Sequence, residues 1–192
     1  MTSGTQMGIW IVTGEPGAGK STAVSRILFR IRSQGFTAGG ILTREIRNHG
    51  EREGFSLIDV STEETVNLAS SVRPMSGPRI GKYHIDLKSL SSLGVRALQH
   101  AKEESDIIVC DEVGPMELLS PEFRRAISHC VLGTGNKPSI CAIHKRLADP
   151  LIDELRNSER AKSYEITFEN RDQLPDEIAD EVIFSLKQEK AN

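Results

Sequence analysis

The chain has 192 residues, of which 38% are hydrophobic, 27% charged and 5% aromatic. This length suits one domain over 1–192, and the composition is that of an ordinary globular protein rather than a disordered one. The net charge of −3 argues against duplex nucleic-acid binding, which needs a basic surface. No apolar run approaches the roughly 18 residues that span a bilayer. Residues 1–6 lack the basic start and the apolar stretch of a secretory signal.

The chain has three cysteines, Cys110, Cys130 and Cys141. Their number is odd and two of them lie in apolar runs, which favours buried, reduced thiols over a disulfide framework. We therefore expect a cytoplasmic protein. The five histidines and three cysteines lack the spacing of metal ligands, so we do not expect a zinc site held by the protein.

The first half of the chain combines short β-rich runs with one amphipathic helix. The helix is expected to begin near Lys20 and to end at Gly35, because its apolar residues recur on one face. A turn at 48–50 predicts an antiparallel hairpin between the runs that flank it. Two prolines and two glycines predict a loop over 71–82. The predicted strands in this half are 8–13, 40–46, 53–59 and 65–69.

The second half continues the alternation. Serine and aspartate precede proline at Ser120 and Asp149, a pattern typical of helix starts. Further helices are expected after Asp86 and around 178–186. The predicted strands in this half are 107–110, 139–143 and 164–168. Alternating strands and helices predict a three-layer α/β/α fold around a mostly parallel sheet.

Residues 14–21 carry the clearest functional motif. Their sequence, Gly-Glu-Pro-Gly-Ala-Gly-Lys-Ser, fits G-x-x-x-x-G-K-[ST] between a predicted strand and a predicted helix. Glycines let backbone N–H groups approach phosphates, Lys20 would reach the β- and γ-phosphates, and the Ser21 hydroxyl would hold Mg²⁺. The glycine spacing does not fit the dinucleotide pattern G-x-G-x-x-G. The predicted phosphate-binding residues are Gly14, Glu15, Pro16, Gly17, Ala18, Gly19, Lys20, Ser21 and Thr22.

Two carboxylates, Asp111 and Glu112, follow the apolar strand predicted over 107–110. Ligands bind at the carboxyl ends of parallel strands, so Asp111 is expected beside the phosphate loop, where it can join Ser21 in holding Mg²⁺. Glu112 would then orient and deprotonate a water molecule that attacks the γ-phosphorus. A carboxylate in this position favours attack by water over transfer to a second nucleotide.

Other candidate residues lie at strand ends and in loops. His144 ends the strand predicted over 139–143, where it could contact the γ-phosphate or serve only the structure. Arg47 and Arg52 flank the hairpin turn, and a cation there could neutralise charge in the transition state. The predicted loop adds three further cations that could do the same or lie solvated on the surface: Arg73, Arg79 and Lys82.

Together these residues resemble the THEP-type nucleoside-triphosphatases, also called cancer-related nucleoside-triphosphatases. The matching blocks follow the order of the family and cover nearly the whole chain. The most specific are Thr43-Arg-Glu-Ile-Arg47, followed by Arg52-Glu-Gly-Phe55, and Asp111-Glu-Val-Gly-Pro-Met-Glu-Leu118. The remaining blocks are 14–22, 81–86, 142–144 and 167–171.

The resemblance implies a RecA-like P-loop fold and slow, Mg²⁺-dependent hydrolysis of ATP, GTP and other nucleoside triphosphates such as CTP and UTP. It assigns phosphate and metal contacts to Lys20 and Ser21, the metal to Asp111 and the attacking water to Glu112. The pair of Asn170 and Arg171 matches an Asn-Arg pair of the family that we expect near the base. No extra interface is evident, so we expect a monomer.

The chain departs from the family at two positions. Pro115 stands where members often have lysine, and Glu51 stands where some have a second arginine. The identity of the cation that stabilises the transition state is therefore open. Two alternatives to a simple triphosphatase also remain. One is a kinase that transfers the γ-phosphoryl group to a nucleotide, a polynucleotide or a small molecule, with 71–82 as its lid, and the other is a nucleotide-dependent switch that uses hydrolysis as a timer.

Overall fold

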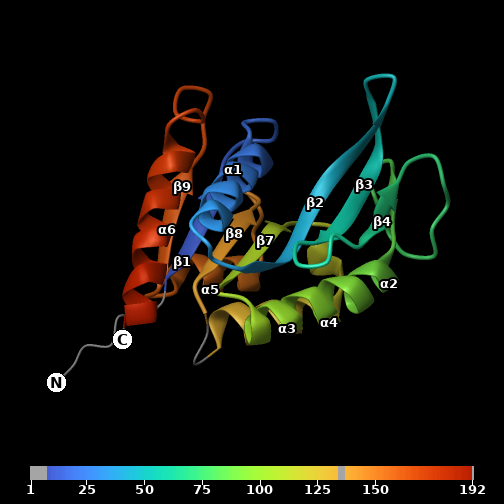
Figure 1. Ribbon diagram of the computed structural model, residues 1–192. Helices are drawn as coiled ribbons and strands as arrows, with labels where there is room; N and C mark the ends of the chain where they lie inside the picture. Colours follow the sequence, from blue (N-terminus) through green and yellow to red (C-terminus); the bar gives the residue numbers. More distant parts are fainter. Residues whose placement is uncertain (1–7, 134–136, 192) are drawn as a thin grey trace.

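The computed structural model describes residues 8–133 and 137–191. Across these residues a nine-stranded sheet with the order β5-β6-β4-β3-β2-β7-β8-β1-β9 runs through the molecule, and helices cover both of its faces (Figure 1). The strands are β1 (Ile9–Thr13), β2 (Ala38–Asn48), β3 (Glu51–Asp59), β4 (Thr65–Ser70), β5 (Arg79–Ile80), β6 (Tyr83–Ile85), β7 (Ile107–Val113), β8 (Ser139–Ile143) and β9 (Ala161–Glu165). The α-helices are α1 (Lys20–Ser33), α2 (Leu87–Ser89), α3 (Val95–Glu104), α4 (Pro121–Ile127), α5 (Pro150–Asn157) and α6 (Leu174–Ala191).

One half of the sheet is parallel and contains β2, β7, β8, β1 and β9. Ile11 pairs with Cys141, and Cys110 pairs with both Cys141 and Ile41, so the apolar strands predicted from the sequence lie side by side. Because these strands run in the same direction, their carboxyl ends meet at one edge of the sheet. The predicted α/β fold with a mostly parallel sheet and an antiparallel hairpin is confirmed.

The other half of the sheet is antiparallel. The predicted hairpin forms between β2 and β3, and β4, β6 and β5 then extend it in that order. Part of the predicted loop 71–82 therefore belongs to the sheet, because Arg79 and Ile80 pair with β6. Strand β2 joins the two halves, since it pairs with β7 as far as Leu42 and continues beyond it in the hairpin.

Each face of the sheet is covered by its own apolar core. On one face, α1 and α6 contribute Val24, Ile27 and Val182, all buried. On the other face, α3 contributes Leu98, α4 contributes Phe123, and α5 contributes its apolar side. Burial of apolar surface on both faces explains why β7 and β8 are almost continuously hydrophobic.

The predicted helix starts are confirmed. The Ser120 hydroxyl accepts a hydrogen bond from the N–H of Phe123 at 3.2 Å, and an oxygen of Asp149 accepts one from Leu151 at 2.9 Å. The helix expected after Asp86 is interrupted, because a π-helical turn at Leu90–Gly94 separates α2 from α3. Within the part of the chain that the structure describes, none of the helices is long and apolar enough to cross a bilayer.

Most predicted strands differ from the structure by one or two residues at their ends, and two differ by more. The strand predicted over 164–168 has the wrong bounds, because β9 occupies Ala161–Glu165 instead. The Asn170 amide donates to the carbonyl of Glu165 at 2.9 Å and accepts from the N–H of Thr167 at 2.8 Å, which turns the chain directly after β9. The strand predicted over 107–110 continues to Val113 and so contains both carboxylates.

The three cysteines are free and buried, as predicted. Burial raises the pKa of the Cys141 thiol to about 12 and raises that of Cys110 well above its ordinary value. These thiols are therefore protonated at neutral pH and pack as small apolar side chains.

Candidate active site

Residues 14–19 connect β1 to α1 and form the phosphate loop. Gly14, Gly17 and Gly19 have φ angles of 155°, 80° and 106°, which L side chains rarely adopt. A Cβ atom at Gly14 would lie only 2.5 Å from the carbonyl oxygen of Ile166. Gly19 precedes α1 without a side-chain cap, so the N–H groups of the first helical turn remain available to an anion.

The predicted phosphate-binding side chains lie around this loop. The Lys20 ammonium group donates to the carbonyl oxygen of Gly14 at 3.2 Å and therefore reaches back across the loop. Ala18 is buried beneath it, whereas Pro16 and Gly17 are exposed at its tip. Thr22 is exposed in the first turn of α1. The position of a Cβ atom on Gly17 has nothing within 4 Å, so the loop backbone is open there, which suits a phosphate chain.

Ser21 and Asp111 lie in direct contact, as the sequence predicts. The Ser21 hydroxyl donates to Oδ1 of Asp111 at 3.2 Å. Asp111 is 0% exposed, and among the described residues its Oδ2 atom has no hydrogen-bond partner. Burial raises the pKa of Asp111 to about 7. A hydroxyl and a carboxylate with an unpartnered oxygen fit Mg²⁺, which prefers oxygen ligands.

Arg44 also faces Asp111, and sequence reasoning assigned it no role. Its Nη1 atom lies 3.7 Å from Oδ2 of Asp111, and its Nη2 atom donates to the Ser25 hydroxyl of α1 at 2.6 Å. The contact follows from register: Leu42 pairs with Asp111, and Arg44 stands two residues further along β2, on the same face. Strand alternation could have indicated the face, but not the pairing of β2 with β7.

Glu112 follows Asp111, and a second glutamate lies behind it. Glu112 is half-buried, and its carboxylate lies against Gly114, where a larger side chain would collide with it. Glu117 is fully buried; the Thr43 hydroxyl donates to its Oε1 atom at 3.5 Å, and its Oε2 atom has no partner in the described part of the chain. Burial, together with the negative charge of Glu112, raises the pKa of Glu117 to about 8. Sequence reasoning missed Glu117, although it lies in the specific block 111–118.

The turn after β8 is attached to the phosphate loop by charged side chains. Lys145 and Arg146 contact the Glu15 carboxylate at 3.3 Å and 2.7 Å, and Lys145 also pairs with Glu165 at 2.6 Å. These cations lower the pKa of Glu15. The predicted His144 is half-buried, and its Nδ1 atom accepts from the N–H of Arg146 at 3.3 Å. The structure therefore brings Lys145 and Arg146, rather than His144, into contact with the phosphate loop. The imidazole ring of His144 stabilises the turn after β8.

Arg47 and Arg52 lie in the hairpin and share the Glu45 carboxylate. Arg52 donates to Glu45 at 2.7 Å and to the Tyr83 hydroxyl at 2.9 Å, and its guanidinium lies over the ring of Phe55. Arg47 pairs with the other carboxylate oxygen. Within residues 8–133 and 137–191, neither guanidinium contacts the phosphate loop, so the structure does not bring these two predicted residues to it.

The structure separates the roles of Asn170 and Arg171. Asn170 holds the turn after β9 through its two hydrogen bonds to the backbone. Arg171 reaches the phosphate loop, because its Cδ atom lies 3.8 Å from the position of a Cβ atom on Gly19. Its guanidinium lies over the ring of Phe168, 5.1 Å from the ring centroid.

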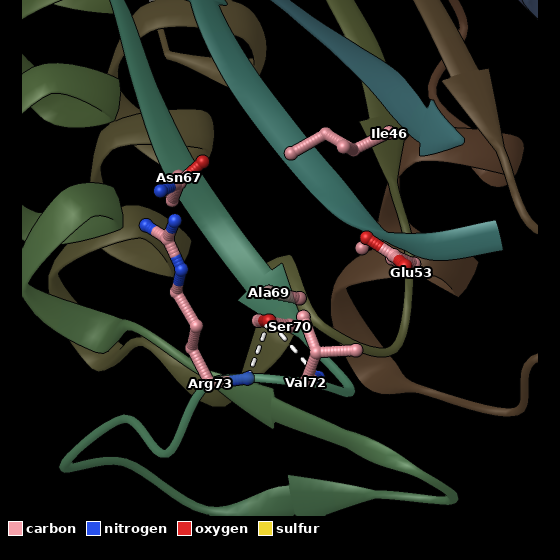
Figure 2. Close-up of a pocket in the computed structure, with 8 residues that line it drawn as sticks. Ile46, Glu53, Asn67, Ala69, Ser70, Val72 and Arg73 are labelled. Atoms are coloured by element: carbon pink, nitrogen blue, oxygen red, sulfur yellow. Dashed lines mark hydrogen bonds between the residues drawn. The ribbon is translucent and has the colours of Figure 1, made fainter. Parts of the chain in front are cut away.

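A pocket of about 180 Å³ lies on the antiparallel half of the sheet, away from the phosphate loop. Figure 2 shows Arg73 extending from its rim toward Asn67, while the Ser70 hydroxyl accepts hydrogen bonds from the N–H groups of Val72 and Arg73. The other predicted cations of this region also make local contacts: Arg79 donates to the carbonyl of Gly81, and Lys82 lies over the ring of Tyr83. In the described residues, no group of three or more His, Cys, Asp and Glu side chains could hold a metal ion.

The fold and the site together define a P-loop NTPase: a glycine loop joins the parallel strand β1 to α1, and the buried Asp111 accepts a hydrogen bond from Ser21 in the first turn of that helix. A sequence model for a family described as NTPase matches residues 9–179. The chain therefore belongs to this NTPase family, whose members hydrolyse nucleoside triphosphates.

Curated relatives and solved structures support the same family. The chain is 42% identical to the nucleoside-triphosphatase THEP1 of Methanosarcina barkeri, over 88% of this chain and 93% of that protein. It is similar to the crystal structure of THEP1 from the hyperthermophile Aquifex aeolicus, with a TM-score of 0.77, 30% identity and coverage of 88% and 96%. It is also similar to the solution structure of a human cancer-related nucleoside triphosphatase, with a TM-score of 0.75, 30% identity and coverage of 92% and 97%.

Proposed function

We propose that this NTPase hydrolyses nucleoside 5′-triphosphates, including ATP, GTP, CTP and UTP, to diphosphate and phosphate, with Mg²⁺ as cofactor, slow turnover and little base preference. The observation that carries the proposal is the hydrogen bond between Ser21 and the buried Asp111 beside the phosphate loop, with Glu112 as the next residue. The names of the relatives, nucleoside-triphosphatase THEP1, support the same reaction.

In this proposal the phosphate chain binds along the N–H groups of the loop and of the first turn of α1. The Lys20 ammonium exchanges its contact with the Gly14 carbonyl for oxygens of the β- and γ-phosphates. Ser21 and Asp111 would hold Mg²⁺, which would supply positive charge against the phosphate oxygens.

Glu112 is the general base of the proposed reaction. It is half-buried next to Asp111, where a carboxylate can orient a water molecule and accept its proton. Arg44 is our candidate for the cation that stabilises the transition state, because it combines partial burial with a contact to Asp111. This assignment replaces Arg47 and Arg52, whose guanidinium groups are engaged by Glu45.

We also propose that the protein acts in the cytoplasm as a monomer. Three free, buried cysteines are typical of proteins from reducing compartments. Sedimentation of the purified protein with and without nucleotide tests the oligomeric state, and a dimer at working concentration would contradict the proposal.

The experiment that tests the function is a product analysis of γ-labelled ATP with Mg²⁺, in the presence and absence of nucleoside monophosphates and RNA. We expect label in free phosphate only. The variant Glu112→Gln should lower turnover by about a hundredfold or more, because general-base catalysis supplies at least that factor, while ADP binding persists. Glu104→Gln, at the exposed end of α3, is the matched control.

Two results would contradict the proposal. Label appearing on an acceptor faster than free phosphate would make the protein a kinase, with the pocket beside Arg73 as the first place to seek the acceptor. Full phosphate release by Glu112→Gln would remove Glu112 as the base.

A further inference from the structure

The order of the strands sets the direction in which a bound nucleotide lies. Asp111 and Glu112 belong to β7, on one side of β1, whereas β9 pairs with β1 on its other side. The proposed reaction requires the γ-phosphate to face the two carboxylates. In that orientation the nucleoside lies on the side of β9 and of the segment 166–173 that follows it.

This segment follows the phosphate loop closely. The N–H of Ile166 donates to the carbonyl of Thr13 at 2.8 Å, directly before the loop. The Cδ atom of Arg171 lies 3.8 Å from the position of a Cβ atom on Gly19, at the end of the loop, and the Arg26 guanidinium of α1 donates to the carbonyl of Asp172 at 2.8 Å. Figure 1 shows the turn after β9 rising beside the loop that leads into α1. The segment thus forms the wall of the site on the nucleoside side.

An aromatic ring stands exposed in this wall. The Phe168 side chain is 65% exposed although it is large and apolar, and the guanidinium of Arg171 covers one part of it at 5.1 Å. A planar guanidinium on a ring provides a flat surface with positive charge, on which a further aromatic ring can stack. The approach of Arg171 to Gly19 places this surface beside the phosphate loop.

One polar side chain of this wall, that of Asn170, is engaged by its own turn. The Asn170 amide forms two hydrogen bonds with the backbone of its own turn, one as donor and one as acceptor. Every nucleobase has a π-face, so stacking alone does not distinguish purines from pyrimidines. Binding of the base by stacking is therefore compatible with all four bases.

We propose that Phe168 and Arg171 form the platform on which the nucleobase of the substrate stacks, and that this mode of binding makes the enzyme tolerant of the base. The inference rests on the proposed function, since it assigns the base site of the same nucleotide. Phe168 contacts the base, and Arg171 holds the ring pair against the phosphate loop.

The test is equilibrium binding with Mg²⁺, by calorimetry, of ADP, GDP, CDP, UDP and pyrophosphate. The variant is Phe168→Ala, and the matched control is Phe184→Ala, because Phe184 is also 65% exposed but lies in the second half of α6. We expect Phe168→Ala to weaken the binding of all four diphosphates about tenfold, the order of one lost stacking contact. Pyrophosphate has no base and should bind as to the wild type. Phe168→Trp should retain nucleotide affinity.

Two outcomes would overturn the platform. One is unchanged ADP affinity in Phe168→Ala, and the other is an equal loss for ADP and pyrophosphate, which would mean that the variant disturbs the phosphate loop. Failure of the proposed function has a different signature. A wild-type chain that binds diphosphates with the expected dependence on Phe168 but releases no phosphate from any triphosphate would refute hydrolysis and support the platform.

Discussion

Asp111 illustrates how single residues determine the chemistry of the site. Burying a carboxylate away from water is unfavourable unless hydrogen bonds or opposite charges compensate it. Here the Ser21 hydroxyl meets one oxygen, and the Arg44 guanidinium lies 3.7 Å from the other. The distance of Arg44 is too long for a hydrogen bond, so this oxygen remains available to a cation. We propose that the same guanidinium meets a charged phosphate group of the bound nucleotide.

Arg44→Ala should lower turnover about a thousandfold, because an arginine that meets the transition state in phosphoryl transfer contributes at least that factor. Arg44→Lys should recover part of the loss, since it restores the charge without the planar group. Steady-state phosphate release measures the effect. Arg96→Ala, which removes an exposed arginine paired with Glu64, is the control and should leave turnover unchanged. Normal turnover in Arg44→Ala would direct attention to Lys145 and Arg146.

Glu117 predicts a pH dependence of stability. Burial raises its pKa in the folded state to about 8, whereas in the unfolded chain it returns to its ordinary value near 4.5. Between these values the unfolded state loses the proton and the folded state keeps it. The free energy of unfolding should therefore fall as pH rises from about 5 to 8, with at most about 1.4 kcal/mol per pH unit from one proton.

Glu117→Gln should reduce this slope in urea unfolding measured across the same pH range. Asp111, whose pKa is also raised, should contribute the part that remains. In the matched control, Glu122→Gln, the slope should stay as in the wild type, because the pKa of this exposed residue is lowered and its titration lies below the range. An identical slope in Glu117→Gln would show that Glu117 is ionised in the folded protein.

At the scale of the elements, the helices on the second face depend on specific end contacts. Asp149 accepts from the N–H of Leu151 at the start of α5, and its carboxylate also receives two hydrogen bonds from Arg124 of α4, at 2.8 Å and 3.0 Å. One side chain thus caps one helix and connects it to another. The bidentate pair with Arg124 lowers the pKa of Asp149, so this stabilisation is present at neutral pH and is lost in acid.

Asp149→Ala should lower the free energy of unfolding by about 1–2 kcal/mol, the usual effect of losing an N-cap. Asp149→Asn is the informative comparison, because asparagine can still cap α5 but has no charge for Arg124. Asp149→Asn should therefore lower the free energy of unfolding less than Asp149→Ala does. Urea unfolding at pH 7 measures both variants. Equal losses in the two would assign the contribution of Asp149 to the ion pair rather than to the cap.

At the scale of the whole molecule, one sheet carries a core on each face. The strands of the parallel half contribute side chains to both cores, since Ile11 belongs to one and Val12 to the other. If either core came apart, the strands that also line the other core would lose the packing on one of their faces. We therefore propose that the chain is one cooperative domain, as its length predicts.

Thermal unfolding should consequently show one transition. The fluorescence of Trp10, the single tryptophan, reports on the core beneath α1 and α6, and far-ultraviolet circular dichroism reports on all elements. The two curves should coincide. ADP with Mg²⁺ at about a hundred times its Kd should stabilise the fold by about 2.7 kcal/mol. An earlier transition confined to the antiparallel half, detected by hydrogen exchange, would contradict a single domain.

The sequence by itself determined the features that a few contiguous residues encode. The glycines of the phosphate loop stand where φ is positive, and Ser120 and Asp149 cap helices at their predicted positions. The alternation of apolar runs determined the layered α/β architecture. These features are local, because backbone conformation and periodicity depend on residues a few positions apart.

Only the tertiary structure decided which distant side chains meet. Arg44 reaches Asp111 because β2 pairs with β7 in one register, and Thr43 meets Glu117 on the opposite face of β2 for the same reason. The bounds of β9 and the approach of Arg171 to the phosphate loop depend on the turn held by Asn170. Register and packing sum small contributions over the whole sheet, so no single stretch of sequence encodes them.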